Sequence, residues 1–153
     1  MSRRKARELA LQALFQMDIA GTDPETATEE ALTREVDADW APGRLTEESA
    51  EFARRLIRGA WEHRAESDEL IARYARGWSV ERMAAVDRAI LRMAVYEIVH
   101  SDEVPDSVAV DEAVELAKAF STADSSRFVN GILGSVIRGT KGAAGADEAV
   151  SRD

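Results

Sequence analysis

Cysteine is absent from this chain of 153 residues, and histidine occurs only twice. Without cysteine there is no disulfide scaffold, no thiol nucleophile and no cysteine-ligated metal site. His63 and His100 do not lie in a spacing typical of metal ligands, so we expect no histidine-based metal site. The sequence therefore predicts a protein that needs neither a metal nor another cofactor.

Long apolar runs are also missing, and none approaches the ~20 residues that span a bilayer. The basic N-terminus is not followed by an uninterrupted apolar region or a cleavage site, which argues against a signal peptide. A Gly-rich phosphate loop and a nucleophile elbow are absent as well, and neither histidine has an evident acid or nucleophile partner. We expect a cytoplasmic protein that is not an enzyme.

The negative charge is confined to one part of the chain. Eleven acids and two bases lie between Asp18 and Glu51, so this segment alone accounts for the net charge of −9. The opposite pole is the N-terminus, where Arg3, Arg4, Lys5 and Arg7 come together. This asymmetry favours a local basic footprint for an anionic partner, although a solvated basic end would look the same.

Helical periodicity dominates the sequence and predicts an all-α fold. The expected helices cover residues 3–19, 25–36, 46–76 with a break near 64–67, 83–99, 107–120 and 124–136. The helix over 83–99 is apolar on nearly every side and should be central. Asn130-Gly131 is a turn signal within the last helix, but no strand alternation surrounds it, so the helix is retained.

Short connections favour two small antiparallel helical bundles that share a core. We expect one domain over residues 1–138, with subdomains of about 1–77 and 78–138 that meet at Gly77. Residues 139–153 are rich in Gly and Ala without periodicity, and we expect them to form a flexible tail.

The first helix carries the clearest functional signal. Beside its apolar stripe lies a second face with Arg4, Glu8, Leu11 and Phe15, and Arg7 one turn before Leu11. Cations neutralise phosphates, and an aromatic ring offers a stacking surface to an unpaired base. The alternative is that Phe15 packs against a neighbouring helix.

Two further clusters are candidates for contacts with nucleic acid. Lys118 and the run Asp124–Arg127 flank the start of the last helix, where exposed backbone N–H groups suit phosphate oxygens. Ordinary helix capping would give the same residues. Tyr74 lies near Arg73 and Arg76, but a buried tyrosine would give that pattern too.

Several segments resemble the NusB family of bacterial transcription antitermination factors. The resemblance covers roughly two thirds of the chain, in order and without large gaps. The matching segments are the basic run Arg3–Phe15, Val86–Arg92 with Tyr96-Glu97, Val104-Pro105, Asp111–Lys118 and Asp124–Leu133. The Phe-Val-Asn-Gly-Ile-Leu run with its upstream aspartate is the most specific of them.

This resemblance implies a function in RNA synthesis. NusB-like proteins bind the boxA element of single-stranded RNA together with the ribosomal protein NusE. The pair joins other Nus factors on RNA polymerase and suppresses premature termination, notably of ribosomal RNA. A homodimer is a further state that the resemblance allows.

Carried over residue by residue, the resemblance assigns two surfaces. The RNA-binding residues are Arg3, Arg4, Lys5, Arg7, Phe15, Tyr74, Asp124, Arg127 and Phe128. The partner surface includes Asp87 and Arg88. The chain departs from the pattern at Phe15, where tyrosine is common, in the acidic residues 22–50, and after Gly139.

Two alternatives stay open. NusB-like domains also precede ribosomal RNA cytosine methyltransferases, but the length of this chain and its lack of cysteine argue against such an enzyme. The second alternative is a module for protein interaction or ribosomal RNA recognition without a role at RNA polymerase.

Overall fold

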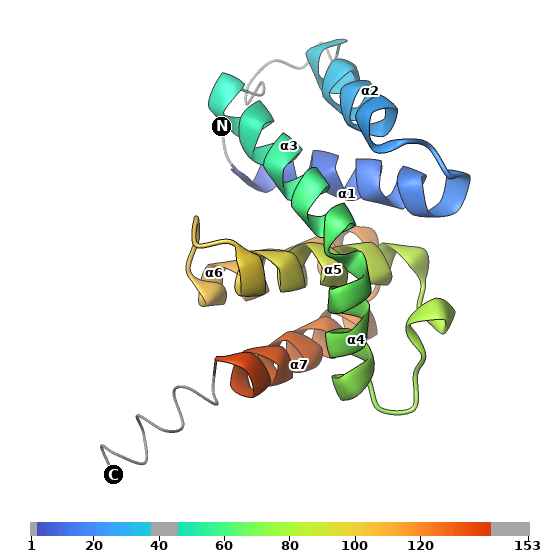
Figure 1. Ribbon diagram of the computed structural model, residues 1–153, viewed down its shortest axis with the longest axis vertical. Helices are drawn as coiled ribbons and strands as arrows, with labels where there is room; N and C mark the ends of the chain where they lie inside the picture. The colour runs from blue at the N-terminus through green and yellow to red at the C-terminus, as the bar shows by residue number, and fades with distance from the viewer. Residues whose placement is uncertain (1–2, 38–45, 142–153) are drawn as a thin grey trace.

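The computed structural model describes residues 3–37 and 46–141, and every regular element in those ranges is helical (Figure 1). The all-α prediction is confirmed. The elements are α1 (Arg3–Ala20), α2 (Pro24–Asp37), α3 (Glu47–Glu62), α4 (Arg64–Tyr74), the 3-10 helix η1 (Val80–Arg82), α5 (Ala85–His100), α6 (Asp106–Phe120) and α7 (Ala123–Thr140). None of these helices combines the length and apolarity that crossing a membrane requires.

Two groups of helices stack on each other (Figure 1). One contains α1, α2 and α3, and the other contains α4, α5, α6 and α7, with α1 and α3 resting on α5. The subdomains 1–77 and 78–138 remain a prediction about folding units, but α4 precedes Gly77 and packs against α5 and α7. Most of the predicted tail, from residue 142 onward, lies outside the described residues, as do residues 38–45.

Local signals in the sequence place most helix ends. Thr46 caps α3 by accepting a hydrogen bond from the backbone N–H of Ser49 at 3.0 Å. Gly77 follows α4 with a φ of +79°, a conformation that glycine adopts without steric cost. α7 continues through Asn130 and Gly131, because the apolar stripe of that helix is buried against the core and overrides the turn signal.

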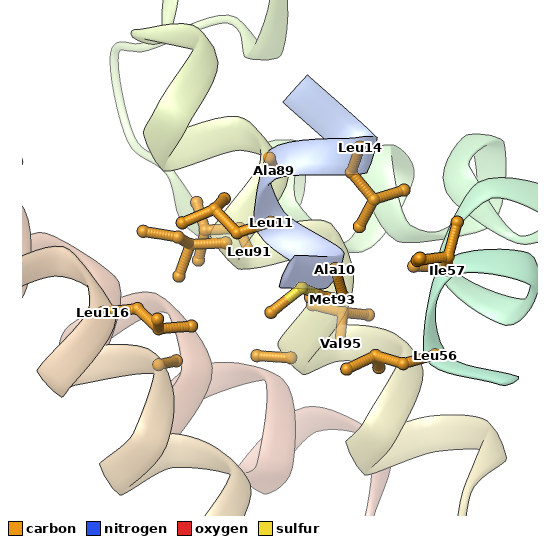
Figure 2. Close-up of a cluster of buried hydrophobic side chains, with 14 of the residues drawn as sticks. Ala10, Leu11, Leu14, Leu56, Ile57, Ala89, Leu91, Met93, Val95 and Leu116 are labelled. Atoms are coloured by element: carbon orange, nitrogen blue, oxygen red, sulfur yellow. The ribbon is translucent and has the colours of Figure 1, made fainter. Parts of the chain in front are cut away.

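α1 lies between the two groups and buries more than one face. Its predicted apolar stripe is buried, including Leu9, Leu14 and Met17. Leu11 lies on the second face with Glu8 and Phe15, as expected, but it is only 5% exposed and belongs to the buried apolar cluster drawn in Figure 2. The burial of Leu11 follows because α1 contacts α5 as well as α2 and α3, and so presents apolar residues to both groups.

A buried ion pair fixes α1 to the central helix. Arg7 donates from Nε and Nη2 to the two carboxylate oxygens of Glu97 at 2.9 and 3.0 Å. Both side chains are 4% exposed, and the Arg7 guanidinium also lies 5.1 Å from the ring centre of Phe52. A two-bonded pair of this kind satisfies both charges where water cannot reach them.

The remaining charged side chains of α5 also bind neighbouring helices. Arg88 donates to Asp18 of α1 at 2.8 Å, and Arg92 donates to Asp68 of α4 at 2.8 and 2.7 Å. These contacts explain how a central helix can carry charge, since its charged side chains reach partners rather than water.

Gly59 of α3 allows the close approach of α5. A Cβ atom at this position would lie 2.0 Å from Cζ of Tyr96, well inside van der Waals contact. The absence of a side chain at Gly59 therefore sets how closely the Tyr96 ring seats against α3.

We expect Glu97→Ala to lower the free energy of unfolding by about 3–5 kcal/mol, because it leaves the Arg7 guanidinium buried without a counter-charge. Urea unfolding followed by circular dichroism measures the loss. Arg4→Ala, which removes a more exposed arginine of the same helix, should change stability little. Equal losses in the two variants would contradict this account.

Gly59→Ala should destabilise the protein by about 1–3 kcal/mol, because the added methyl group collides with Tyr96. Gly131→Ala is the matched control, since nothing lies within 4 Å of its Cβ position, and it should stabilise α7 by about 0.5–1 kcal/mol. Thermal unfolding of both variants measures the effect. A neutral Gly59→Ala would show that the ring of Tyr96 can move aside.

Candidate nucleic-acid interface

The N-terminal cations lie at the surface beside acidic partners. Arg4 is 55% exposed and donates to both carboxylate oxygens of Glu112, at 3.1 and 2.8 Å. Arg3 donates to the backbone carbonyl of Glu103 at 3.3 Å. Lys5 lies 3.9 Å from Glu8 on the same helix. The basic footprint is therefore present, but its cations are already paired.

Arg7 is the exception among the predicted phosphate contacts. Its side chain is buried, its Nε and Nη2 donate to Glu97, and its Nη1 lies 4.0 Å from Oε1 of Glu112. A direct contact between Arg7 and a phosphate does not fit this burial, because it would break a buried ion pair. The sequence pattern did not reveal the burial of Arg7, because a single helix does not show that the second group packs against this part of α1.

The pairing of Arg4 with Glu112 shifts the titration of both groups. The hydrogen bond from Arg4 holds the pKa of Glu112 below its usual range, and the same bond raises the pKa of Arg4. The pair is intact above the ordinary carboxyl range and is lost as the pH falls through the lowered pKa of Glu112. Near neutral pH an incoming phosphate must compete with this carboxylate for Arg4.

An apolar cleft of about 460 Å³ follows the basic end along α1. Phe15 lines it and is 38% exposed, so its ring is not a core side chain. Ile19 and Phe120 line the same cleft at 58% and 47% exposure, and Arg34 of α2 lies at its edge. Phe120 falls on the apolar stripe of α6, but it is the last residue of that helix and lies past the core.

A second cleft of about 360 Å³ lies between the starts of α5 and α7. Trp78, which is 57% exposed, and Phe128 line it together with Met83. Asp87 also lines it and accepts a hydrogen bond from Oγ of Ser125 at 2.9 Å on one carboxylate oxygen. Its other oxygen, Oδ1, is buried and has no hydrogen-bond partner among the described residues, so a ligand with an N–H donor would satisfy it.

The polar residues at the start of α7 serve largely as caps. Thr122 accepts a hydrogen bond from the N–H of Ser125 at 2.9 Å, and Ser126 donates to the carbonyl of Ala123 at 2.7 Å. Asp124 and Arg127 form an ion pair with each other on the exposed side of the helix. The capping alternative therefore accounts for the serines, while Asp124 and Arg127 are open to solvent.

The basic end and the two clefts follow one another along α1 and the first turn of α5, and we treat them together as one candidate face. Glu8, one turn after Arg4, lines the first cleft, and Val86 of that cleft adjoins Asp87 of the second. We call this face the aromatic track. It joins Arg3 and Arg4 with the exposed rings of Phe15, Phe120 and Trp78 and with the partly buried ring of Phe128. Trp78 and Phe120 were missed in the sequence, and an aromatic residue outside any apolar stripe is the signal that would have found Trp78.

Besides the buried Arg7, two more predicted site residues do not lie on the aromatic track. Tyr74 lies against Gly139, so it sits about 16 Å along α7 from Phe128. Arg88 lies inside, bound to Asp18 and to the backbone carbonyls of η1 and its end. Direct contact with a partner does not fit Arg88, because its donors are occupied within the protein.

Comparison with known proteins agrees with this architecture. Residues 4–138 match the NusB family. The transcription antitermination protein NusB of Symbiobacterium thermophilum is 87% identical over 153 residues, covering 100% of each chain.

The fold of this chain is also similar to that of solved NusB structures. A structure of T. maritima NusB has 37% identity and a TM-score of 0.77, covering 90% of this chain and 92% of that one. A crystal structure of antitermination factors NusB and NusE in complex with dsRNA has 24% identity and a TM-score of 0.78, covering 90% of this chain and 96% of that one, and it supports the fold alone. With the family matched over residues 4–138 and a relative identical at 87% of positions, this chain belongs to the NusB family.

Proposed function

We propose that this protein is a non-enzymatic adaptor for transcription antitermination that works in the cytoplasm. It binds boxA-type single-stranded RNA together with ribosomal protein NusE and supports transcription of ribosomal RNA. The observation that carries the proposal is the aromatic track, a surface of exposed rings next to arginines in a member of the NusB family. Other Nus factors and RNA polymerase complete the assembly, and a homodimer is an additional state of the free protein.

The basic end of the track binds the RNA backbone. Arg3, Arg4 and Lys5 contact phosphates, and their present carboxylate partners hold the side chains extended until RNA arrives. Arg34 adds a cation at the edge of the cleft that contains Phe15. The phenyl ring of Phe15 stacks on an unpaired base, which the apolar walls of the cleft shield from water.

The end of the aromatic track that contains Phe128 and Trp78 binds the next bases along the RNA strand. Phe128 and Trp78 offer stacking surfaces, and Arg127 lies where it can reach a phosphate. The unsatisfied oxygen of Asp87 accepts a hydrogen bond from a base amino group or from a backbone N–H of the protein partner. Asp124, beside Arg127, orients that arginine and can accept from a base edge.

Three residues act from inside the protein. Arg7 fixes the helix that carries the basic end, and Arg88 holds Asp18 and the turn before α5. Tyr74 supports the far end of α7 by packing against Gly139. Substitution of any of these three residues lowers RNA binding because it displaces the aromatic track, not because it removes a direct contact with RNA.

Net charge −9 makes weak nonspecific binding to RNA the expectation for the isolated chain, so useful affinity depends on NusE. A module for protein interaction alone would also use exposed apolar clefts. The two functions separate by salt dependence, because only RNA binding releases counterions and weakens steeply as salt rises.

Phe15→Ala and Phe128→Ala should each weaken binding of boxA RNA to the NusE complex by about 5- to 150-fold, because each removes one stacking surface. Fluorescence anisotropy with labelled RNA measures the loss. Trp61→Ala removes an aromatic residue that does not line the aromatic track and should leave affinity unchanged. Unaltered affinity in both phenylalanine variants would place the RNA elsewhere.

Arg4→Ala should reduce the slope of log affinity against log salt by about 0.7, the value for one phosphate contact on a single strand. Arg73→Ala removes an exposed arginine from another part of the surface and should leave the slope as it is. Glu112→Gln should have the opposite effect on affinity and raise it by up to about fivefold, since it frees Arg4 from a competing carboxylate. Weaker binding by Glu112→Gln would contradict the role given to this pair.

A further inference from the structure

The two histidines of the chain meet at the junction of three helices. His63 is the residue between α3 and α4, and His100 is the last residue of α5. Their rings stack with centroids 3.9 Å apart and planes inclined by 21°. The spacing of His63 and His100 in the sequence gave no hint of this approach, because only the packing of α5 across the α3–α4 junction produces it.

Glu66, in the first turn of α4, completes the cluster. Its Oε2 lies 2.9 Å from Nε2 of His100, and its Oε1 lies 3.7 Å from Nδ1 of His63. One ligand atom from each of the three residues lies within 4.8 Å of the other two. Tetrahedral zinc, with bonds of about 2.0–2.2 Å, places its ligand atoms about 3.3 Å apart. The donors must therefore close by about 1.5 Å at most.

The backbone around the cluster is fixed, whereas its side chains can rotate. The N–H of His63 donates to Gly59 at 3.0 Å, and its carbonyl accepts from Ser67 at 2.9 Å. The side chains of His63, Glu66 and His100 are 39%, 47% and 31% exposed, so they can rotate about their χ angles on the surface without entering the core. Solvent reaches the cluster directly, which gives an ion both an entry path and a water ligand.

The described neighbours of the cluster include an aromatic ring and an arginine that is bound elsewhere. The ring of Tyr96 lies on one side of the pair, 5.8 Å from His63 and 6.1 Å from His100 between centroids. Arg64 is adjacent in sequence, but its guanidinium lies 3.9 Å over the ring of Trp61 and donates to the Trp61 carbonyl. Two imidazoles and one carboxylate favour zinc over magnesium or calcium, which prefer oxygen ligands.

We propose that His63, Glu66 and His100 form a zinc site with three protein ligands and a water molecule in the fourth position. The ion ties the α3–α4 junction to the end of α5, where the two groups of helices meet. The site lies about 20 Å along α5 from Asp87, so it is separate from the base-binding end of the aromatic track. It does not depend on the proposed function in RNA binding.

Isothermal titration of zinc chloride into the full-length, tag-free protein tests the site. We expect one zinc ion per chain, no heat from magnesium chloride, and at least a tenfold loss of affinity in each of His63→Ala, His100→Ala and Glu66→Gln. Glu69→Gln is the matched control, because Glu69 is an exposed acid of the same helix outside the cluster, and it should bind zinc like the unmodified chain. Circular dichroism confirms that each variant is folded.

Two further readouts separate a built site from general binding by surface acids. Zinc should shift the ring proton signals of both histidines in the NMR spectrum, and those two residues are the only histidines present. It should also raise the melting temperature of the unmodified chain and not that of His63→Ala with His100→Ala. Absence of binding up to about 1 mM zinc, or equal binding by the double histidine variant, would overturn the proposal.

Discussion

The buried pair between Arg7 and Glu97 is the contact on which the arrangement of the two helical groups depends. It joins the first helix to the central helix at a place closed to water, with both oxygens of the carboxylate engaged. A shift of α1 along α5 by even one residue would separate these atoms and leave two charges buried. The pair thus fixes the register of α1, and with it the positions of Arg4 at one end of that helix and Phe15 toward the other.

Polar contacts also fix the central helix α5 against its other neighbouring helices. Its charged side chains each reach a different point of the surrounding structure, and the pairs are Asp87 with Ser125, Arg88 with Asp18, Arg92 with Asp68 and Glu97 with Arg7. Apolar packing alone tolerates sliding, since one aliphatic contact resembles the next. Polar contacts at four positions do not tolerate such sliding, so they specify one alignment of α1, α4 and α7 around α5.

The fold was largely predictable because periodicity reports which side of a helix is buried. The stripe of Leu9, Leu14 and Met17 and the central position of residues 85–100 follow from that alone. The burial of Arg7 was missed because a single helix does not reveal that a second group packs on its other side. Of the residues that line the two clefts, Phe15, Phe128 and Asp87 were among the predicted site residues, while Phe120 and Trp78 were not, because their approach depends on contacts between distant segments, which no local pattern encodes.

The carboxylate of Glu112 binds Arg4, so an incoming anion must displace this carboxylate before it can bind the arginine. A solitary anion such as a free nucleotide would trade one ion pair for another and gain almost nothing. A polymer that reaches several cations and stacking rings in one event adds these small gains, because every contact after the first is intramolecular. Under the proposed function, this face would therefore bind mononucleotides weakly and favour an RNA chain long enough to cover all of it.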